Sequence, residues 1–502
     1  DYRQYLAYNN IHHQDFVNRD KWTISNRASG FSLVGISIKI RNKLEQVLAR
    51  YIHQPEELAI AKALILGNKE DLDKSTKETF ATAGAMHVLA VSGLHVGIIY
   101  LVLISLLGQK RSNITKPVLI AVIVIPILWL YAFITGLSPS VLRAVTMFSF
   151  LTLAHVFGRR SNTLNILAIS AFILLMFNPY MIMAVGFQLS YVAVIGIIFL
   201  FPVIERRITP SNQVLRVVWQ ITALSVAAQL ATFPLSALYF HRFPTYFLIS
   251  NLVVIPAATL IIWGGLLLLL AGSISGFLGS IIGSGVGFII GIVNTVLKSM
   301  TQWPYADIQN LVPSIFESWI TYGIIILFFL FLIEKKRLYY HLSLAAIIVL
   351  VANLFYWEIK GNNLRQVTIY SIHNRWAIDL IENRKYQTIT DSLLSTETSK
   401  IDFHITPYRR QFNLQIDNRS IKTRKTQWGD AFVWHGKKIL LADPCINSIE
   451  LPEIFDLLLI KPAVSSYDCY QEQIVLRKLV EDQQIHFEEH NLKKEGALII
   501  NL

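Results

Sequence analysis

Two histidines, a serine and two glycines stand together at the head of a hydrophobic run, where Met86 to Gly97 reads MHVLAVSGLHVG. Ser92 and His95 are three residues apart and can touch on a helix, and a hydroxyl beside an imidazole is the pairing of a serine nucleophile with its base. No carboxylate stands nearby to orient the histidine, so structural or pore-lining roles are favoured over catalysis. His87 and His95 are eight residues apart, about 80° of helical rotation, and are predicted to line one broad face.

Other polar residues interrupt later hydrophobic runs, and ionisable groups at membrane depth are functional candidates because they are costly there. Arg143 follows Gly136-Leu137-Ser138-Pro139. It is interpreted either as a phosphate contact along a pore or as an arginine that pairs with carbonyls at a broken helix end. Further clusters contain Gln188 with Ser190, and Asn251 among several prolines. A proline inside a helix leaves backbone groups without hydrogen-bond partners, which neighbours or water must then supply. Each cluster taken alone is nevertheless more typical of helix packing than of a functional site.

The elements that must position these residues are membrane spans. The chain has 502 residues, of which 53% are hydrophobic and 16% charged, and its mean hydropathy is +0.46. Such a composition is typical of a polytopic membrane protein. Apolar runs of about 17–25 residues predict about ten spans, near 88–108, 117–136, 141–157, 164–182, 185–203, 217–240, 246–271, 279–298, 318–334 and 340–357.

The expected fold is a polytopic α-helical membrane protein with a small C-terminal α/β or β-rich soluble domain. Residues 31–86 are expected to form amphipathic helices leading into the membrane, and residues 87–357 the transmembrane domain. Residues 360–502 alternate short apolar strands with polar turns, and Trp434-His435-Gly436-Lys437 reads as a hairpin turn. Cys445 and Cys469 form no CxxC pair, so no zinc site is indicated, and whether they form a disulfide stays open.

Basic residues gather in four loops that fall on one side of the membrane if ten spans are correct. Because positive loops are cytoplasmic, both the N-terminal segment and the C-terminal domain are expected outside the cytosol. The same rule explains the net charge of +12 better than nucleic-acid binding by a soluble domain does. The loops contain Lys110, Arg111 and Lys116; Arg159 and Arg160; Arg206, Arg207 and Arg216; and Lys335, Lys336 and Arg337.

Carboxylates are scarce in the predicted membrane domain. Between His87 and Trp357 they are Glu205, Asp307, Glu317 and Glu334, all in loops or at span ends. A carrier coupled to protons or sodium usually needs a buried carboxylate, so this distribution argues against that class and suits a pathway for a polyanion. No GxxxxGK[ST] loop for a nucleotide is present, so energy would come from partner proteins.

The motifs resemble those of the ComEC-type competence family, the inner-membrane channels that import DNA. In family order they are Ala63–Asn68, Phe80 and Gly84, the His87–His95 signature, Ser138 with Arg143-Ala144, Gly186–Ser190, and Phe233-Pro234 to Asn251 and Pro256. Residues 1–30 resemble the tail of the family's OB-like domain, so the chain is expected to be an N-terminally truncated fragment. Ala184 stands where similar proteins often carry an acidic residue, which puts any role of that carboxylate in doubt.

The resemblance also implies a metallo-β-lactamase-like domain over residues 360–502. Gly429–Asp443 and Asp456–Ile460 resemble its early strands, but the metal-binding HxHxDH that should follow is replaced by Lys461–Asp468, which reads KPAVSSYD. Metal ligation needs imidazole and carboxylate groups that converge. His373, His404, His435, His486 and His490 are scattered singly and do not rebuild the motif. A degenerate domain without metal, cofactor or nuclease activity is expected.

The resulting hypothesis is a multi-pass channel of the inner membrane that carries single-stranded DNA and is not an enzyme. Its partners would be DNA, membrane lipids, and the DNA receptor and motor proteins of the uptake machinery; a homo-oligomer stays open. One alternative is an intramembrane serine hydrolase that uses Ser92 with His155 or His241, and another is a lipid or glycan transporter. The residues expected at the pore or its motifs are His87, Ser92, Gly93, His95, Arg143, Gln188, Ser190 and Asn251.

Overall fold

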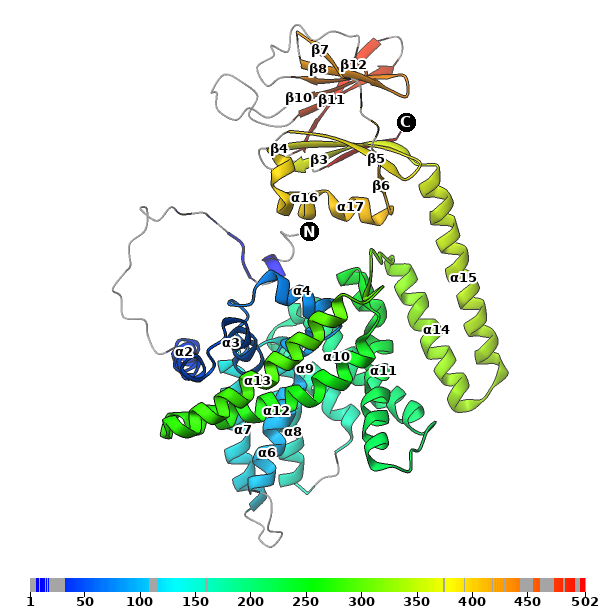
Figure 1. Cartoon of the computed structure of the whole chain (residues 1–502). Coiled ribbons are helices and arrows are strands. Elements are labelled where there is room, and N and C mark those ends of the chain that lie inside the picture. The colour runs from blue at the N-terminus through cyan, green and yellow to red at the C-terminus, as the bar shows by residue number, and fades with distance from the viewer. Residues whose placement is uncertain are drawn as a thin grey trace. The chain divides into compact units, whose positions relative to one another are not determined.

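The computed structural model separates the chain into two units, Asp1–Leu344 and Ala345–Leu502 (Figure 1). It describes residues 6–8, 10–13, 15, 17, 32–107, 116–158, 161–372, 375–391, 393–417, 419, 421, 423–427, 429–442, 455–460, 474–481, 484–492 and 497–501. Several residues weighed above lie outside these ranges: Lys110, Arg111, Arg159, Arg160, His373, Cys445, Cys469 and the segment 461–468.

The helices of the first unit, and α15 (Arg337–Asn362), which continues from the first unit into the second, follow the predicted hydrophobic runs. Within the described ranges, eight are long and apolar enough to cross a membrane: α7 (Lys116–Ile134), α8 (Pro139–Val156), α10 (Val185–Glu205), α11 (Gln213–Phe240), α12 (Phe247–Ile274), α13 (Gly276–Thr301), α14 (Ile315–Glu334) and α15 (Arg337–Asn362). The two remaining predicted spans correspond to α6 (Gly93–Leu107) and α9 (Thr163–Phe177), each of 15 residues. A helix needs about 20 apolar residues to cross a bilayer unaided, so these two are short for that task.

The segment before the first predicted span takes part in the core of the bundle. It forms α2 (Leu33–Tyr51), α3 (Pro55–Ala61), a single π-helical turn (Lys62–Leu66), α4 (Lys74–Thr82) and α5 (Met86–Leu89). Leu48, Ile60, Leu64 and Phe80 of this segment are buried in one cluster with apolar residues of α12 and α13. The π turn ends at Gly67, whose φ of +76° is left-handed, and a Cβ there would lie 2.8 Å from the carbonyl oxygen of Thr135.

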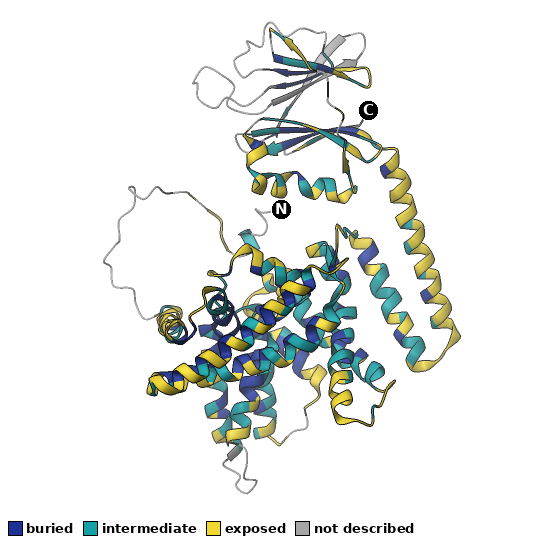
Figure 2. Ribbon diagram, in the orientation of Figure 1, coloured by how far each residue is buried: buried dark blue, intermediate teal, exposed yellow. Residues whose placement is uncertain are grey.

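Many residues along the helices of the first unit are exposed (Figure 2), and large apolar ones are among them. They include Leu101, Val122, Phe172 and Phe199, which are between 52% and 69% exposed. In a soluble protein such surfaces would be unfavourable, whereas a bilayer is as apolar as the side chains that face it. The exposed apolar surface therefore supports the membrane assignment.

The second unit is a strand-rich domain with two sheets. One has the order β13-β3-β4-β5-β6 and the other β12-β11-β10-β9-β8-β7. The strands of the first are β3 (Arg365–Ile372), β4 (Arg375–Glu382), β5 (Lys385–Thr390), β6 (Gln415–Ile416) and β13 (Leu498–Asn501); those of the second are β7 (Arg424–Thr426), β8 (Gly429–Trp434), β9 (Lys437–Ala442), β10 (Leu457–Ile460), β11 (Ile474–Glu481) and β12 (Gln484–Asn491).

Apolar residues of both sheets share one core. Val367 and Ile378 of the first sheet pack in a cluster with Phe432, Ile439 and Leu457 of the second. The short helices α16 (Thr398–His404) and α17 (Thr406–Gln411) accompany the first sheet, where Ile405 is buried with residues of β3 and β4. The predicted hairpin is confirmed, since Trp434 pairs with Lys437 across the turn between β8 and β9.

A buried ion pair holds α17 on the first sheet. Asp379 of β4 is fully buried, and Arg409 of α17 donates to its two carboxylate oxygens at 2.8 and 2.7 Å. The hydroxyls of Tyr370 and Thr388 also donate to Asp379, at 2.8 and 2.7 Å. Every carboxylate oxygen thus has a donor, which is the condition under which a charge is tolerated inside a protein.

Candidate functional site

The MHVLAVSGLHVG segment does not form the continuous helix that hydropathy predicted. Helix α5 ends at Leu89, Ala90 is extended with ψ of 131°, and α6 begins only at Gly93. Ser92 caps α6, because its Oγ accepts the N–H of Leu94 at 3.3 Å. The predicted start of this span at 88 is therefore wrong, and so is the interpretation that His87 and His95 share one helical face.

His95 lies inside the membrane domain with one ring nitrogen engaged and one free of partners. Its side chain is 0% exposed, and its Nδ1 accepts the backbone N–H of Ser92 at 3.2 Å, with Ser92 Oγ at 3.1 Å. Because Nδ1 is an acceptor, the proton of the neutral ring belongs on Nε2. No described group bonds Nε2, so this N–H is a buried donor available to a ligand.

Arg143 approaches the same turn from α8. It is 8% exposed, and its Nε donates to Ser190 Oγ of α10 at 2.6 Å, while its Nη1 lies 3.3 Å from Met147 Sδ. Its guanidinium carbon is 5.9 Å from the centre of the Tyr191 ring. A Cβ on residue 93 would lie 2.7 Å from Arg143 Nη2, so only a glycine lets the guanidinium occupy this place.

The site thus combines residues of three helices, with Ser92, Gly93 and His95 at the head of α6, Arg143 on α8 and Ser190 on α10. In the described ranges no carboxylate forms an ion pair with Arg143, although Arg242 and Lys298 of the same unit each have an acidic partner. The described hydrogen-bond partners of Arg143 are the hydroxyl of Ser190 and the thioether of Met147. They are not the backbone carbonyls that the second interpretation of this arginine required. Sequence reasoning missed Met147 and Tyr191 as its neighbours, although their spacing from Arg143 and Ser190 along two helices could have indicated them.

Three other predicted residues do not join this cluster by any described contact. Gln188 ties helices together, since its Nε2 donates to the carbonyl of Ile182 at 2.8 Å and its Oε1 accepts from the Tyr239 hydroxyl at 2.9 Å. His87 is exposed and its Nδ1 donates to the carbonyl of Gly84 at 3.1 Å. Asn251 is buried on α12, and its Oδ1 has no partner among the described groups.

The geometry gives little support to a hydrolase built on Ser92. His155 is twelve residues beyond Arg143 on α8, which places it about 18 Å along the helix axis at 1.5 Å per residue. His241 donates from Nδ1 to the carbonyl of Leu311 at 3.2 Å. His95 itself touches Ser92, but its Nδ1 also takes a backbone N–H and no described carboxylate orients it. A serine nucleophile needs a base held by a third group.

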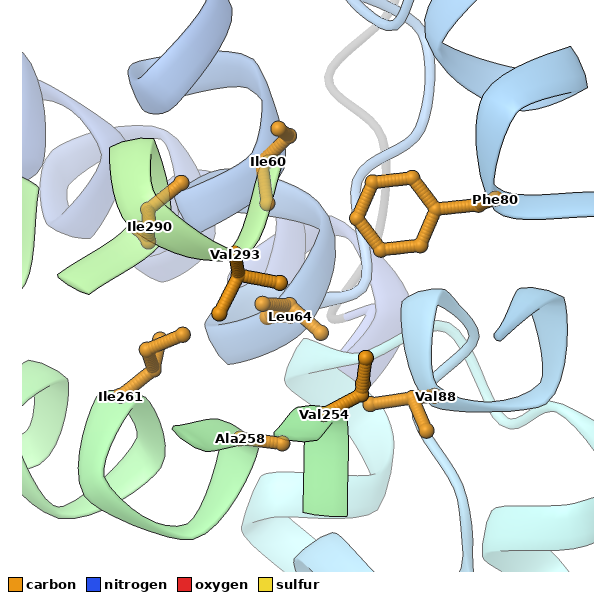
Figure 3. Close-up of a pocket in the computed structure, with 9 residues that line it drawn as sticks. All are labelled: Ile60, Leu64, Phe80, Val88, Val254, Ala258, Ile261, Ile290 and Val293. Carbon is orange, nitrogen blue, oxygen red and sulfur yellow. The ribbon is translucent and has the colours of Figure 1, made fainter. Parts of the chain in front are cut away.

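An apolar cavity lies beneath the motif and is too small to be a substrate site (Figure 3). Its volume is about 10 Å³, and Figure 3 shows Val88 of α5 facing Leu64, Phe80 and Val254. This is room for about one water molecule, and apolar cavities of this kind stay dry. The cavity is therefore part of the packing between α5 and its neighbours.

Comparison with known sequences identifies the family. Residues 64–337 match the family model described as "Competence protein", which is more than half of the chain and contains every residue of the site. The chain belongs to the competence protein family. Residues 367–486 match a second family model, described as "ComEC C-terminal domain". With eight apolar helices of sufficient length among its described residues, this family member is a multi-pass inner-membrane protein.

Relatives of this competence protein are found in several bacteria. It is 27% identical over 288 residues to ComE operon protein 3 of Bacillus subtilis, which covers 57% of this chain and 35% of that protein. It is 23% identical over 259 residues to Recombination protein 2 of Haemophilus influenzae, covering 48% and 32% of the two chains. The match thus spans about a third of the length of these relatives. No solved structure matches the chain significantly.

The described part of the competence protein contains no group of three histidine, cysteine, aspartate or glutamate side chains that could hold a metal ion. The segment 461–468, where the sequence departs from the metal-binding motif, lies outside the described residues. His404 and His435 lie far apart along the chain, on α16 and in the β8–β9 turn, and His435 Nε2 is 3.1 Å from Glu382 Oε1.

Proposed function

We propose that this protein is the channel through which one strand of DNA crosses the cytoplasmic membrane during natural transformation. The observation that carries the proposal is Arg143, a buried guanidinium without a described counter-ion, inside the region that matches the competence family. A buried charge without a partner costs several kcal/mol. The phosphate of a passing strand would supply that partner, and Arg is well suited to phosphate because of its planar set of donors.

The distribution of charge supports a polyanion in the membrane domain. Residues 87–344 contain 14 Lys and Arg but 4 Asp and Glu, whereas residues 345–502 contain 19 of each. Much of the excess lies in loops, where it sets orientation, but Arg143 does not. We propose His95 as a second contact, because its buried Nε2–H has no described acceptor. Ser92, Gly93 and Ser190 would position these two groups, and His87, Gln188 and Asn251 would shape the path.

The remaining expectations extend the proposal. If the positively charged loops face the cytoplasm, the N-terminal segment and the C-terminal domain would lie outside the cytosol. There they would receive DNA from the receptor of the uptake machinery, and a motor protein would supply the energy. The C-terminal domain would be a degenerate metallo-β-lactamase-like domain without nuclease activity. We find no observation that favours the serine hydrolase or the lipid or glycan transporter.

The test is an Arg143→Gln variant of the full-length protein in its own, naturally competent organism. We expect labelled duplex DNA to reach a protected outer compartment, while entry into the cytoplasm falls at least about tenfold, because about 1.4 kcal/mol of lost stabilisation gives that factor. Arg143→Lys keeps the charge and should retain part of the activity. Arg216→Gln, which alters an exposed arginine on α11, is the matched control.

Unchanged DNA entry in Arg143→Gln, with normal amounts of protein in the membrane, would remove Arg143 from the pathway. Unchanged transformation on complete deletion, in a strain shown to be competent, would sink the DNA-channel proposal itself.

A further inference from the structure

Two carboxylates that precede the predicted membrane domain lie along one of its helices. Glu56 and Glu57 belong to α3, which is too short to span a membrane and packs on α13. A Cβ on Gly287 would lie 2.9 Å from Glu57 Oε2, and one on Gly291 would lie 2.8 Å from Oε1. These glycines are residues 12 and 16 of the 26-residue α13. The Glu57 carboxylate therefore rests beside the middle of a membrane-spanning helix, where a charge is costly.

The carboxylate of Glu57 faces an open groove with otherwise weakly polar walls. The groove has a volume of about 390 Å³ and is lined by Glu57, Phe288, Gly291, Ile292, Thr295 and Val296. The hydroxyl of Thr295 already donates to the carbonyl of Gly291 at 2.8 Å. In the described part of the chain no basic group forms an ion pair with Glu57. Among the described groups its charge thus has neither a cation nor a free donor from the groove.

Glu56, unlike Glu57, forms an ion pair with a basic residue within the described ranges. Lys298 Nζ lies 2.7 Å from Glu56 Oε1, and Thr76 Oγ1 donates to the same oxygen at 3.1 Å. The bond to Lys298 lowers the pKa of Glu56. Burial raises the pKa of Glu57, and the negative charge of Glu56 beside it adds to the effect. Lys298 and Asn294 of α13 and Thr76 of α4 are the hydrogen-bond partners of Glu56.

We propose that Glu57 is a proton-binding site of the membrane domain, which takes up and releases its proton through the groove on α13. Protonation removes the charge that this position cannot otherwise compensate, since carboxylates in apolar surroundings become neutral rather than stay ionised. The proposal does not depend on DNA as the substrate. It means that the scarcity of carboxylates after His87 does not exclude coupling to protons, because α3 brings one into the bundle.

The test uses dicyclohexylcarbodiimide, an apolar reagent that modifies protonated carboxyl groups, on the full-length protein in native membranes. Peptide mass spectrometry would locate the modified residue across a range of pH. We expect modification at Glu57 and little at Glu56, with a midpoint above the ordinary glutamate pKa of about 4.3. Glu57→Gln should abolish the modification. Glu56→Gln should move the midpoint to lower pH, because it removes the adjacent charge and frees Lys298.

Equal modification of Glu56 and Glu57, or a midpoint at the ordinary value, would overturn the proposal. So would a Glu57 that is unreactive at every pH, which would instead indicate a cation from a partner helix in the groove. If a variant fails to reach the membrane, the titration of the unaltered protein still decides between these outcomes.

Discussion

The guanidinium of Arg143 occupies the space that a side chain on residue 93 would need. Its Nη2 lies 2.7 Å from the position of a Cβ on Gly93, and Ser190 Oγ holds its Nε at 2.6 Å. Gly93 and Arg143 therefore belong to one arrangement, in which the missing side chain at the head of α6 leaves room for a buried positive charge. The position of the guanidinium depends on the glycine.

This relationship predicts that Gly93→Ala disrupts the site while Gly97→Ala does not. At Gly93 the new methyl group would displace the guanidinium, whereas a Cβ at Gly97 would meet Phe148 at 3.5 Å, an ordinary contact. We expect entry of DNA into the cytoplasm to fall at least about tenfold in Gly93→Ala, with little loss of stability, because the atom displaced is the far end of a flexible side chain. Transformation frequency and thermal unfolding in detergent measure the two effects. Equal behaviour of the two variants would contradict the role given to Gly93.

Ser92 and His95 are predicted to contribute unequally. Ser92→Ala removes the helix cap, worth about 1 kcal/mol, but leaves the backbone N–H that orients His95 Nδ1. We therefore expect Ser92→Ala to retain most DNA entry and His95→Phe, which deletes the buried Nε2–H, to lose most of it. A fluorophosphonate probe should not label Ser92. Labelling that disappears in Ser92→Ala would restore the serine hydrolase as the better hypothesis.

The packing of α2 on α13 predicts a second pair of glycine variants. A Cβ on Gly283 would lie 2.5 Å from Tyr51 Cβ and 2.8 Å from the Tyr51 carbonyl oxygen, whereas a Cβ on Gly285 meets nothing within 4 Å. Because backbone cannot move aside as a side chain can, Gly283→Ala should cost about 1–3 kcal/mol of stability, and Gly285→Ala much less. Thermal unfolding of the purified variants, with limited proteolysis between α2 and α3, is the measurement. Matching unfolding temperatures would argue against this contact.

We predict that Tyr370 makes the C-terminal domain sensitive to alkali. Burial raises the pKa of its phenol, and Asp379 beside it adds to the shift. A raised folded-state pKa means that this stabilisation is complete below the unfolded tyrosine pKa of about 10 and declines as pH rises above it. We expect protease resistance of the domain to fall with pH above about 10 in the unaltered protein. Tyr370→Phe should start from lower stability, because Asp379 loses a donor, and should show a shallower decline. An identical decline would assign the effect to other groups.

The helical membrane fold could be predicted from local sequence, because length and hydropathy of a run decide whether a helix can cross a bilayer. The same reasoning failed at the head of α6. Val88, Leu89, Ala90 and Val91 are apolar enough to continue a span, and the break depends on Ala90 adopting an extended conformation and Ser92 capping α6. Periodicity does not distinguish a continuous helix from two helices that meet at a cap.

The sequence by itself determined the helical runs, the hairpin at Trp434–Lys437 and the residue types of the candidate site, because each depends on neighbours along the chain. Only the tertiary structure decided that Arg143 meets Gly93 and Ser190, and that Glu57 lies beside Gly287 and Gly291. These partners are up to about 230 residues apart, and helices of similar hydropathy carry no local mark of which neighbour they will pack against. Small residues and the shapes of facing surfaces make that choice.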